Sequence, residues 1–90
     1  MRSVIAKERR LIFSRRLHEL RTASNFTFKK LSAFSGIPAS TIATWERGTA
    51  FPSDTFAIAR LAFVFNVPLS YLFGEENETL SFLYGGDRYL

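Results

Sequence analysis

The stretch from Gly36 to Gly48 constrains the fold more than any other part of the 90-residue chain. It opens with a glycine that can turn the backbone and closes with a glycine that can end a helix. Residues 38–47 between them have the length and composition of a short helix, and Ile42 and Trp45 lie three positions apart on one face of it. Most of its other side chains are small or carry a hydroxyl group. Such a helix, anchored on one side, is suited to insertion into a groove.

The composition restricts the class of protein. Ninety residues suffice for one domain with a modest core, and an apolar fraction of 47% argues against disorder. The chain has no cysteine and a single histidine, so neither disulfides nor a metal site are expected. No apolar run approaches the roughly 18 residues of a membrane helix, and the N-terminus lacks the apolar region of a signal peptide. We therefore expect a cytoplasmic protein without a membrane partner.

The charges are distributed unevenly along the chain. Residues 1–47 carry ten Lys and Arg against three Asp and Glu, whereas residues 48–90 carry two against five. A basic half joined to an acidic half indicates one face that binds a polyanion and another that is kept away from it. The alternative is a solvated charged surface on the first helix.

Apolar periodicity and helix-end signals predict an all-α fold. The five expected helices cover residues 7–23, 28–35, about 38–47, about 54–65 and 69–73. In the first helix, Phe13, Leu17 and Leu20 form one apolar stripe. Leu11 and Ile12 lie outside this stripe, so the start of that helix is expected to pack on something else.

Two helix starts carry cap signals. Thr27 is the predicted N-cap of the second helix, and Ser53 or Asp54 that of the fourth. Lys29 and Lys30 lie in the first turn of the second helix, where each opposes the helix dipole by a few tenths of a kcal/mol. An anionic ligand at this helix start would compensate for that cost, although simple exposure to solvent is also adequate.

The chain is predicted to divide into a helical domain over residues 1–74 and a C-terminal tail over residues 75–90. Residues 79–84 of the tail have strand-like composition, and the following glycine pair could turn it into a hairpin. Ten phenylalanines exceed what a five-helix core needs, although Phe13, Phe26 and Phe65 are expected in the core. The candidates for a second apolar surface, a dimer interface, are Phe56, Phe63, Phe73, Phe82, Tyr84 and Tyr89. The alternative is one larger core with the tail folded back.

A set of residues within this order of helices resembles the lambda-repressor-like helix-turn-helix family, of the Cro/CI or XRE type. The residues that carry the resemblance are Phe26-Thr27, Leu31, Gly36-Ile37, Ser40-Thr41-Ile42, Trp45-Glu46-Arg47-Gly48, Pro52 and Asn66-Val67-Pro68 through Leu72. The resemblance covers residues 13–74 and implies a five-helix DNA-binding domain. Residues 38–47 would be the recognition helix in the major groove, and residues 28–35 would lie across the DNA backbone.

The resemblance also implies roles for individual residues. The base-reading positions are Ala39, Ser40 and Thr44, with Thr41 close by. The phosphate-binding positions are Thr27 and Phe28 before and at the start of the second helix, and Arg47 and Thr49 after the third, to which we add Lys29 and Lys30. Arg21 and Glu46 match a structural ion pair of some members.

Four positions depart from the family pattern. Phe28 stands where glutamine is common and Phe34 where a charged residue is usual, and Pro38 and Ala39 stand where polar residues are frequent. Small hydroxyl-bearing side chains do not give the bidentate base contacts that arginine or glutamine make, each worth about 1–3 kcal/mol. We therefore expect affinity to depend mainly on phosphate contacts and on DNA shape.

The leading hypothesis is a homodimeric, sequence-specific transcriptional regulator, a repressor of phage or mobile-element type. Its partner would be double-stranded operator DNA, which places it at the nucleoid, and no cofactor or small-molecule substrate is expected. An enzyme is not expected, because Glu8, Glu19 and Glu46 have no matching nucleophile or glycine-rich loop. The alternative is a protein-interaction module that uses its aromatic surface, such as an antitoxin-like or anti-repressor partner of a second regulatory protein, with DNA binding secondary.

Overall fold

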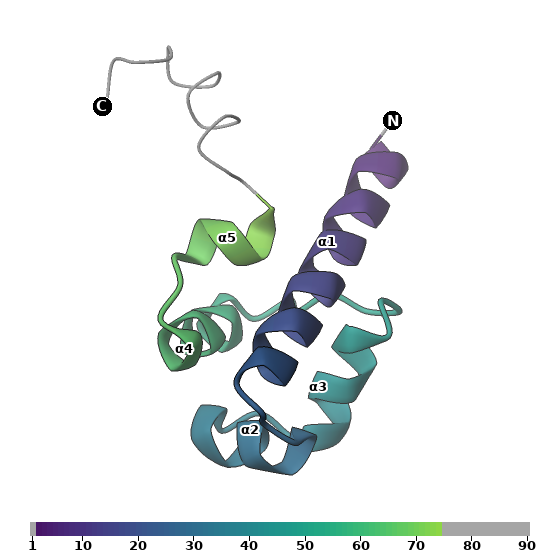
Figure 1. Ribbon diagram of the computed structural model, residues 1–90. Coiled ribbons are helices and arrows are strands. Elements are labelled where there is room, and N and C mark those ends of the chain that lie inside the picture. Colours follow the sequence, from purple (N-terminus) through teal and green to yellow (C-terminus); the bar gives the residue numbers. More distant parts are fainter. Residues whose placement is uncertain (1, 75–90) are drawn as a thin grey trace, which may run out of the picture.

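The computed structural model describes residues 2–74, which form helices connected by short loops (Figure 1). The five helices are α1 (Arg2–Ala23), α2 (Phe28–Ser35), α3 (Ala39–Glu46), α4 (Thr55–Phe65) and α5 (Leu69–Phe73). Helix α1 contacts α3 and α5, α2 contacts α3 and α4, and α4 contacts α5. No strand occurs within residues 2–74, and the predicted all-α class is confirmed. None of the helices in this part of the chain is long and apolar enough to cross a membrane.

The helix ends follow the predicted cap signals. The Thr27 side chain accepts a hydrogen bond from the Lys30 amide at 3.0 Å, so it satisfies one of the free N–H groups at the start of α2. Of the two predicted caps of α4, Asp54 is the one observed, and it accepts from the Phe56 amide at 2.9 Å. Asn66 ends α4 in the left-handed conformation, with φ of 57°.

Two predicted helix ranges were wrong by a few residues. Helix α1 begins at Arg2 rather than at residue 7, because no proline or glycine precedes Lys7 to interrupt it. Helix α3 is one residue shorter at each end than the predicted 38–47, since Pro38 has an extended ψ of 140° and Arg47 follows as the C-cap. The tail over residues 75–90, with its predicted hairpin, lies outside the described residues.

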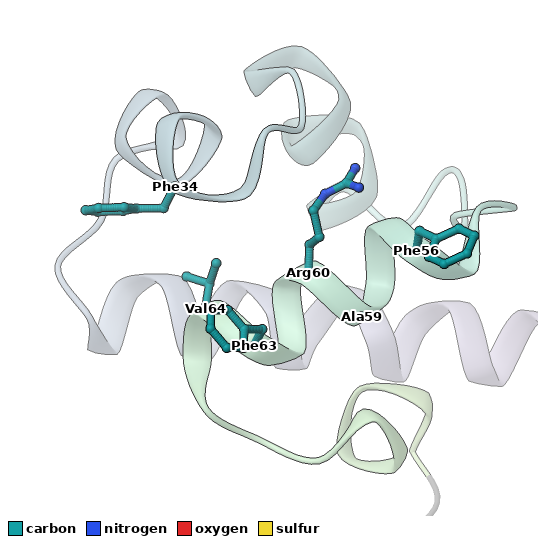
Figure 2. A pocket seen from close by; sticks show the side chains of 6 residues that line it. All are labelled: Phe34, Phe56, Ala59, Arg60, Phe63 and Val64. Atoms are coloured by element: carbon teal, nitrogen blue, oxygen red, sulfur yellow. The ribbon is translucent and has the colours of Figure 1, made fainter.

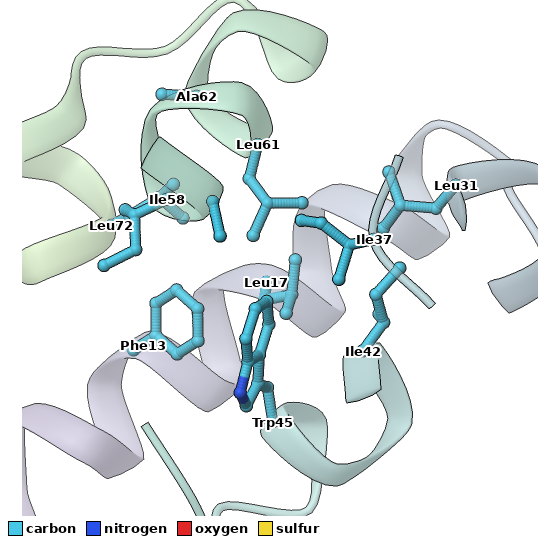
Figure 3. Packing of buried hydrophobic residues seen from close by; sticks show 11 residues of the cluster. Phe13, Leu17, Leu31, Ile37, Ile42, Trp45, Ile58, Leu61, Ala62 and Leu72 are labelled. Atoms are coloured by element: carbon cyan, nitrogen blue, oxygen red, sulfur yellow. The ribbon is translucent and has the colours of Figure 1, made fainter. Parts of the chain in front are cut away.

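One apolar core connects all five helices (Figure 3). Its fully buried large side chains are Phe13, Leu17, Leu31, Ile42, Ile58, Leu61 and Leu72. Leu20, the third member of the predicted stripe, is half-buried against this core, as are Phe26 and Phe65. The core therefore includes the predicted phenylalanines, one of them completely enclosed and the other two at its edge.

Leu11 and Ile12 pack where two later helices end, which confirms the predicted second contact of α1. A Cβ atom added at Gly48 would lie 3.2 Å from Leu11 Cδ2, and one added at Gly74 would lie 2.9 Å from Ile12 Cγ2. Both glycines also have φ near +80°, a conformation that other residues rarely adopt. The close approach of α1 to the ends of α3 and α5 thus depends on both glycines.

Candidate nucleic-acid interface

Helix α3 is held by two buried anchors and presents small side chains elsewhere. Ile42 is fully buried and Trp45 is 8% exposed, and the Trp45 ring meets Phe13 edge-on with centroids 5.9 Å apart (Figure 3). Among the predicted base-reading residues, Ser40 is exposed. The other three, Ala39, Thr41 and Thr44, are half-buried. The helix is therefore fixed from one side, which positions its remaining surface.

Hydrogen bonds connect the predicted base-reading and phosphate-binding residues of α3. The Thr44 hydroxyl donates to the Ser40 carbonyl oxygen at 2.9 Å and accepts from Arg47 Nη2 at 3.0 Å. Thr49 donates from its hydroxyl to the Thr44 carbonyl oxygen at 3.3 Å. Since a hydroxyl has only one proton to donate, these bonds leave Thr44 with its methyl group and one remaining lone pair for any further contact. Arg47 and Thr44 therefore form one unit, although their sequence positions predict separate functions.

The start of α2 forms a second polar group. Thr27, Lys29 and Lys30 are exposed there, and the backbone N–H groups of a helical first turn point outward along the helix axis. Phe28 is half-buried against the core, with its ring 4.1 Å from the Arg21 guanidinium carbon. Its side chain therefore has a packing role, and any phosphate contact at position 28 would be made by the backbone N–H.

A largely buried ion pair connects the end of α3 to the end of α1. Arg21 donates from Nε to Glu46 Oε2 at 2.6 Å and from Nη2 to Oε1 at 3.0 Å, and it also donates from Nη1 to the Phe26 carbonyl oxygen. The two charged side chains are 12% and 6% exposed. The hydrogen bond to Glu46 raises the pKa of Arg21 above its usual value, against the opposing effect of burial. The guanidinium therefore stays charged and holds α1 and α3 together.

His18 is a further member of this cluster, which the sequence analysis did not include. Its Nδ1 lies 2.8 Å from Glu46 Oε1, while its side chain is 56% exposed. The signal was its position three residues before Arg21, which puts both on one face of α1. Across residues 2–74, no group of three or more His, Cys, Asp or Glu side chains could hold a metal ion.

The arginines of α1 mostly bind backbone carbonyls at the ends of other helices. Arg10 Nε donates to the Gly48 carbonyl oxygen at 2.8 Å, Arg16 Nη1 to that of Tyr71 at 2.6 Å, and Arg9 Nη1 to that of Phe73 at 3.1 Å. Helix C-termini carry partial negative charge, so these contacts are favourable. These arginines therefore join α1 to the ends of α3 and α5.

Three of the six predicted members of the second apolar surface fall within residues 2–74. Phe56 and Phe63 on α4 are 74% and 86% exposed. Phe73 is half-buried against the core, and its ring centroid lies 6.2 Å from that of Phe51. Phe82, Tyr84 and Tyr89 are outside the described residues. Phe34, a departure from the family pattern that the sequence analysis did not assign to this surface, is 59% exposed beside the α4 residues (Figure 2).

This arrangement defines a class of protein. Two short helices joined by a tight glycine turn, with the second anchored through Ile42 and Trp45, form a helix-turn-helix unit. The sequence model of the helix-turn-helix domain family matches residues 12–70. The chain belongs to this family of DNA-binding domains, and its partner is DNA. Comparisons with curated proteins and with solved structures find no match.

Proposed function

We propose that this chain is a homodimeric, sequence-specific transcriptional regulator of the Cro/CI or XRE type, which represses genes of a phage or mobile element from the nucleoid. The observation that carries the proposal is the anchoring of α3, whose small polar surface is bonded to the exposed Arg47, while Lys29 and Lys30 are exposed at the start of the preceding helix. Repression is the simplest outcome, because a protein that occupies an operator needs no further activity to exclude others from it. The assignment to phage or mobile elements extends the family resemblance.

The proposed mode of recognition follows from the side chains on α3. Residues 39–46 include no arginine, lysine, asparagine or glutamine, the residues that form bidentate contacts with guanine or adenine. Ala39 and the methyl groups of Thr41 and Thr44 would contact thymine methyls, while Ser40 would bond a base edge. Phosphate contacts would come from Lys29, Lys30, Arg47 and Thr49, together with the N–H groups at the start of α2, from Thr27 on.

Two sets of variants test this division of roles. Lys29→Ala and Lys30→Ala should each weaken binding to every duplex alike. Each should also reduce the slope of log affinity against log salt by about 0.9, the value expected for one neutralised phosphate. Ser40→Ala should instead change which sequences are enriched from a random duplex pool. Arg15→Ala removes the same charge from an exposed position on α1, so it is the matched control and should leave the salt slope unchanged.

A protein-interaction module is the second candidate function. The exposed phenylalanines Phe34, Phe56 and Phe63 favour it, because large exposed apolar side chains gathered on one face commonly mark a binding surface. The salt titration separates the two candidates. Binding to random duplex that falls steeply with salt supports the regulator, whereas no binding to any duplex at low salt would contradict it and favour an antitoxin-like or anti-repressor role.

A further inference from the structure

The outer surface of α4 has a pattern that suits pairing with a copy of itself. Phe56, Ala59, Arg60 and Phe63 follow the spacing of one helix face, with a large aromatic side chain at each end and the smallest residue near the middle (Figure 2). The midpoint between Phe56 and Phe63 falls between Ala59 and Arg60. If two such helices cross antiparallel about this midpoint, Phe56 of each copy meets Phe63 of the other, and Ala59 allows the helix axes to approach.

Arg60 would obstruct this crossing if its side chain projected outward. Instead, Arg60 Nε donates to the Ser35 carbonyl oxygen at 2.9 Å. Ser35 is the last residue of α2, so the guanidinium lies against the negative end of that helix dipole. The contact draws the charge of Arg60 toward α2 within its own chain, so Arg60 remains exposed beside Ala59 with its guanidinium directed away from the middle of the α4 face (Figure 2).

A shallow cavity lies beside this face. It measures about 280 Å³ and is lined by Phe26, Phe34, Phe63 and Val64. Phe34 forms its wall on α2, with its ring centroid 5.4 Å from that of Phe26. In the antiparallel arrangement, Phe56 of the second copy would reach this cavity, since it is the side chain that meets Phe63. Both partners then receive one phenylalanine and insert one, as a two-fold interface requires.

The exposed area is in the range that a reversible dimer needs. Phe34, Phe56 and Phe63 are 59%, 74% and 86% exposed. If a phenylalanine buries about 200 Å², these three would bury roughly 400 Å² in each copy, hence about 800–900 Å² in the pair before Ala59 and Val64 are included. Specific interfaces begin near about 1,000 Å², so the area fits a weak dimer that forms most fully on a two-fold operator.

We propose that two copies of this chain associate through the α2–α4 face formed by Phe34, Phe56, Ala59, Phe63 and Val64, with the two α4 helices antiparallel about Ala59. This assignment deepens the proposed homodimeric function and rests on it. It replaces the surface expected from sequence, which combined α4 with α5 and the tail. The two ends of α2 then have separate tasks, with Lys29 and Lys30 toward DNA and Phe34 toward the second copy.

A complementation experiment on the full 90-residue chain tests the pairing. Sedimentation equilibrium should show wild type dimerising between about 1 and 200 μM. Phe56→Lys and Phe63→Glu should each raise the dimer dissociation constant by about a hundredfold, because the altered contact occurs twice in a symmetric dimer. Mixing the two variants should restore association, since each mixed dimer has one Lys–Glu contact and one unchanged Phe–Phe contact. Leu69→Lys, an exposed apolar position on α5, is the control and should associate like wild type.

Each other result would overturn the proposal. Wild type that remains monomeric at the highest concentration has no such interface. If each variant alone still forms a dimer, the interface lies elsewhere. If the two variants do not associate when mixed, the antiparallel contact is excluded, and the tail or another protein is left as the occupant of this face. Circular dichroism melting should show that both variants are folded, because positions 56 and 63 are exposed. Binding of the monomeric variants to duplex at low salt reports on the proposed DNA function separately, so the two proposals can fail independently.

Discussion

Glu46→Ala is expected to lower the free energy of unfolding by about 3 kcal/mol, near the lower end of the 3–5 kcal/mol typical for breaking a buried ion pair. The variant leaves the Arg21 guanidinium, only 12% exposed, without its carboxylate. Arg21 retains its contacts with the Phe26 carbonyl oxygen and the Phe28 ring, and these moderate the destabilisation. For a domain of this size, the melting temperature should fall by about 12–24 °C.

A double-mutant cycle separates the ion pair from the volume that each side chain occupies. Arg21→Leu combined with Glu46→Leu should destabilise the fold by much less than the sum of the single changes, because no unpaired charge remains. His18→Ala is the matched control, since it removes a largely exposed neighbour of Glu46 and should change stability by about 0.5 kcal/mol or less. Additive single and double variants would show that Arg21 and Glu46 are not coupled.

The raised pKa of Arg21 also predicts how this stabilisation depends on pH. A group whose pKa is higher in the folded state contributes stability that is fully present below its unfolded pKa and is lost only as the pH rises through the folded value. For Arg21 both values lie far above neutrality. The difference in melting temperature between wild type and Arg21→Leu should therefore not shrink between about pH 7 and pH 9 through loss of the arginine charge.

The helices were predictable because their ends depend on single residues with local effects. Thr27 caps the start of α2 by a bond within the first turn, and Asn66 and Gly74 end α4 and α5 in a left-handed conformation. Such signals need no knowledge of the rest of the fold. Where no local signal existed, at the start of α1, the prediction failed. The burial of Ile42 and Trp45 could also be predicted, since apolar residues on one helix face indicate the core side.

The contacts between helices could not be predicted in the same way. The arginines of α1 look like a polyanion-binding surface in sequence, but the acceptors that Arg10 and Arg16 bind are backbone carbonyls, which no residue type signals. The hydroxyl of Thr44 likewise has a partner in Arg47 that only the geometry of α3 reveals. Phe34 and Phe56 lie on different helices, so their common face follows from the packing of α2 against α4. The DNA-binding roles of individual residues stay predictions.

Phe13→Ala is expected to have the second large effect, a decrease of about 3–5 kcal/mol in the free energy of unfolding. Phe13 is fully buried and its ring meets two others edge-on, Trp45 on α3 at 5.9 Å and Phe51 in the following loop at 5.2 Å. Removing the ring opens a cavity where α1 supports α3, and it eliminates both the buried apolar area and the two edge-on aromatic interactions. Chemical denaturation monitored by Trp45 fluorescence measures the change.

Two controls show whether this destabilisation comes from the cavity. Phe13→Leu fills most of the space and should cost clearly less than alanine. Phe63→Ala removes the same side chain from an 86% exposed position, so at concentrations too low for association it should cost about 0.5 kcal/mol or less. Where Phe13→Ala remains folded, Lys29 and Lys30 are still exposed, so its binding to duplex should keep the wild-type dependence on salt. Its preference among DNA sequences should decline, because that preference requires a fixed α3. Equal destabilisation by Phe13→Ala and Phe63→Ala would contradict the view that the core side chains hold this helix in place.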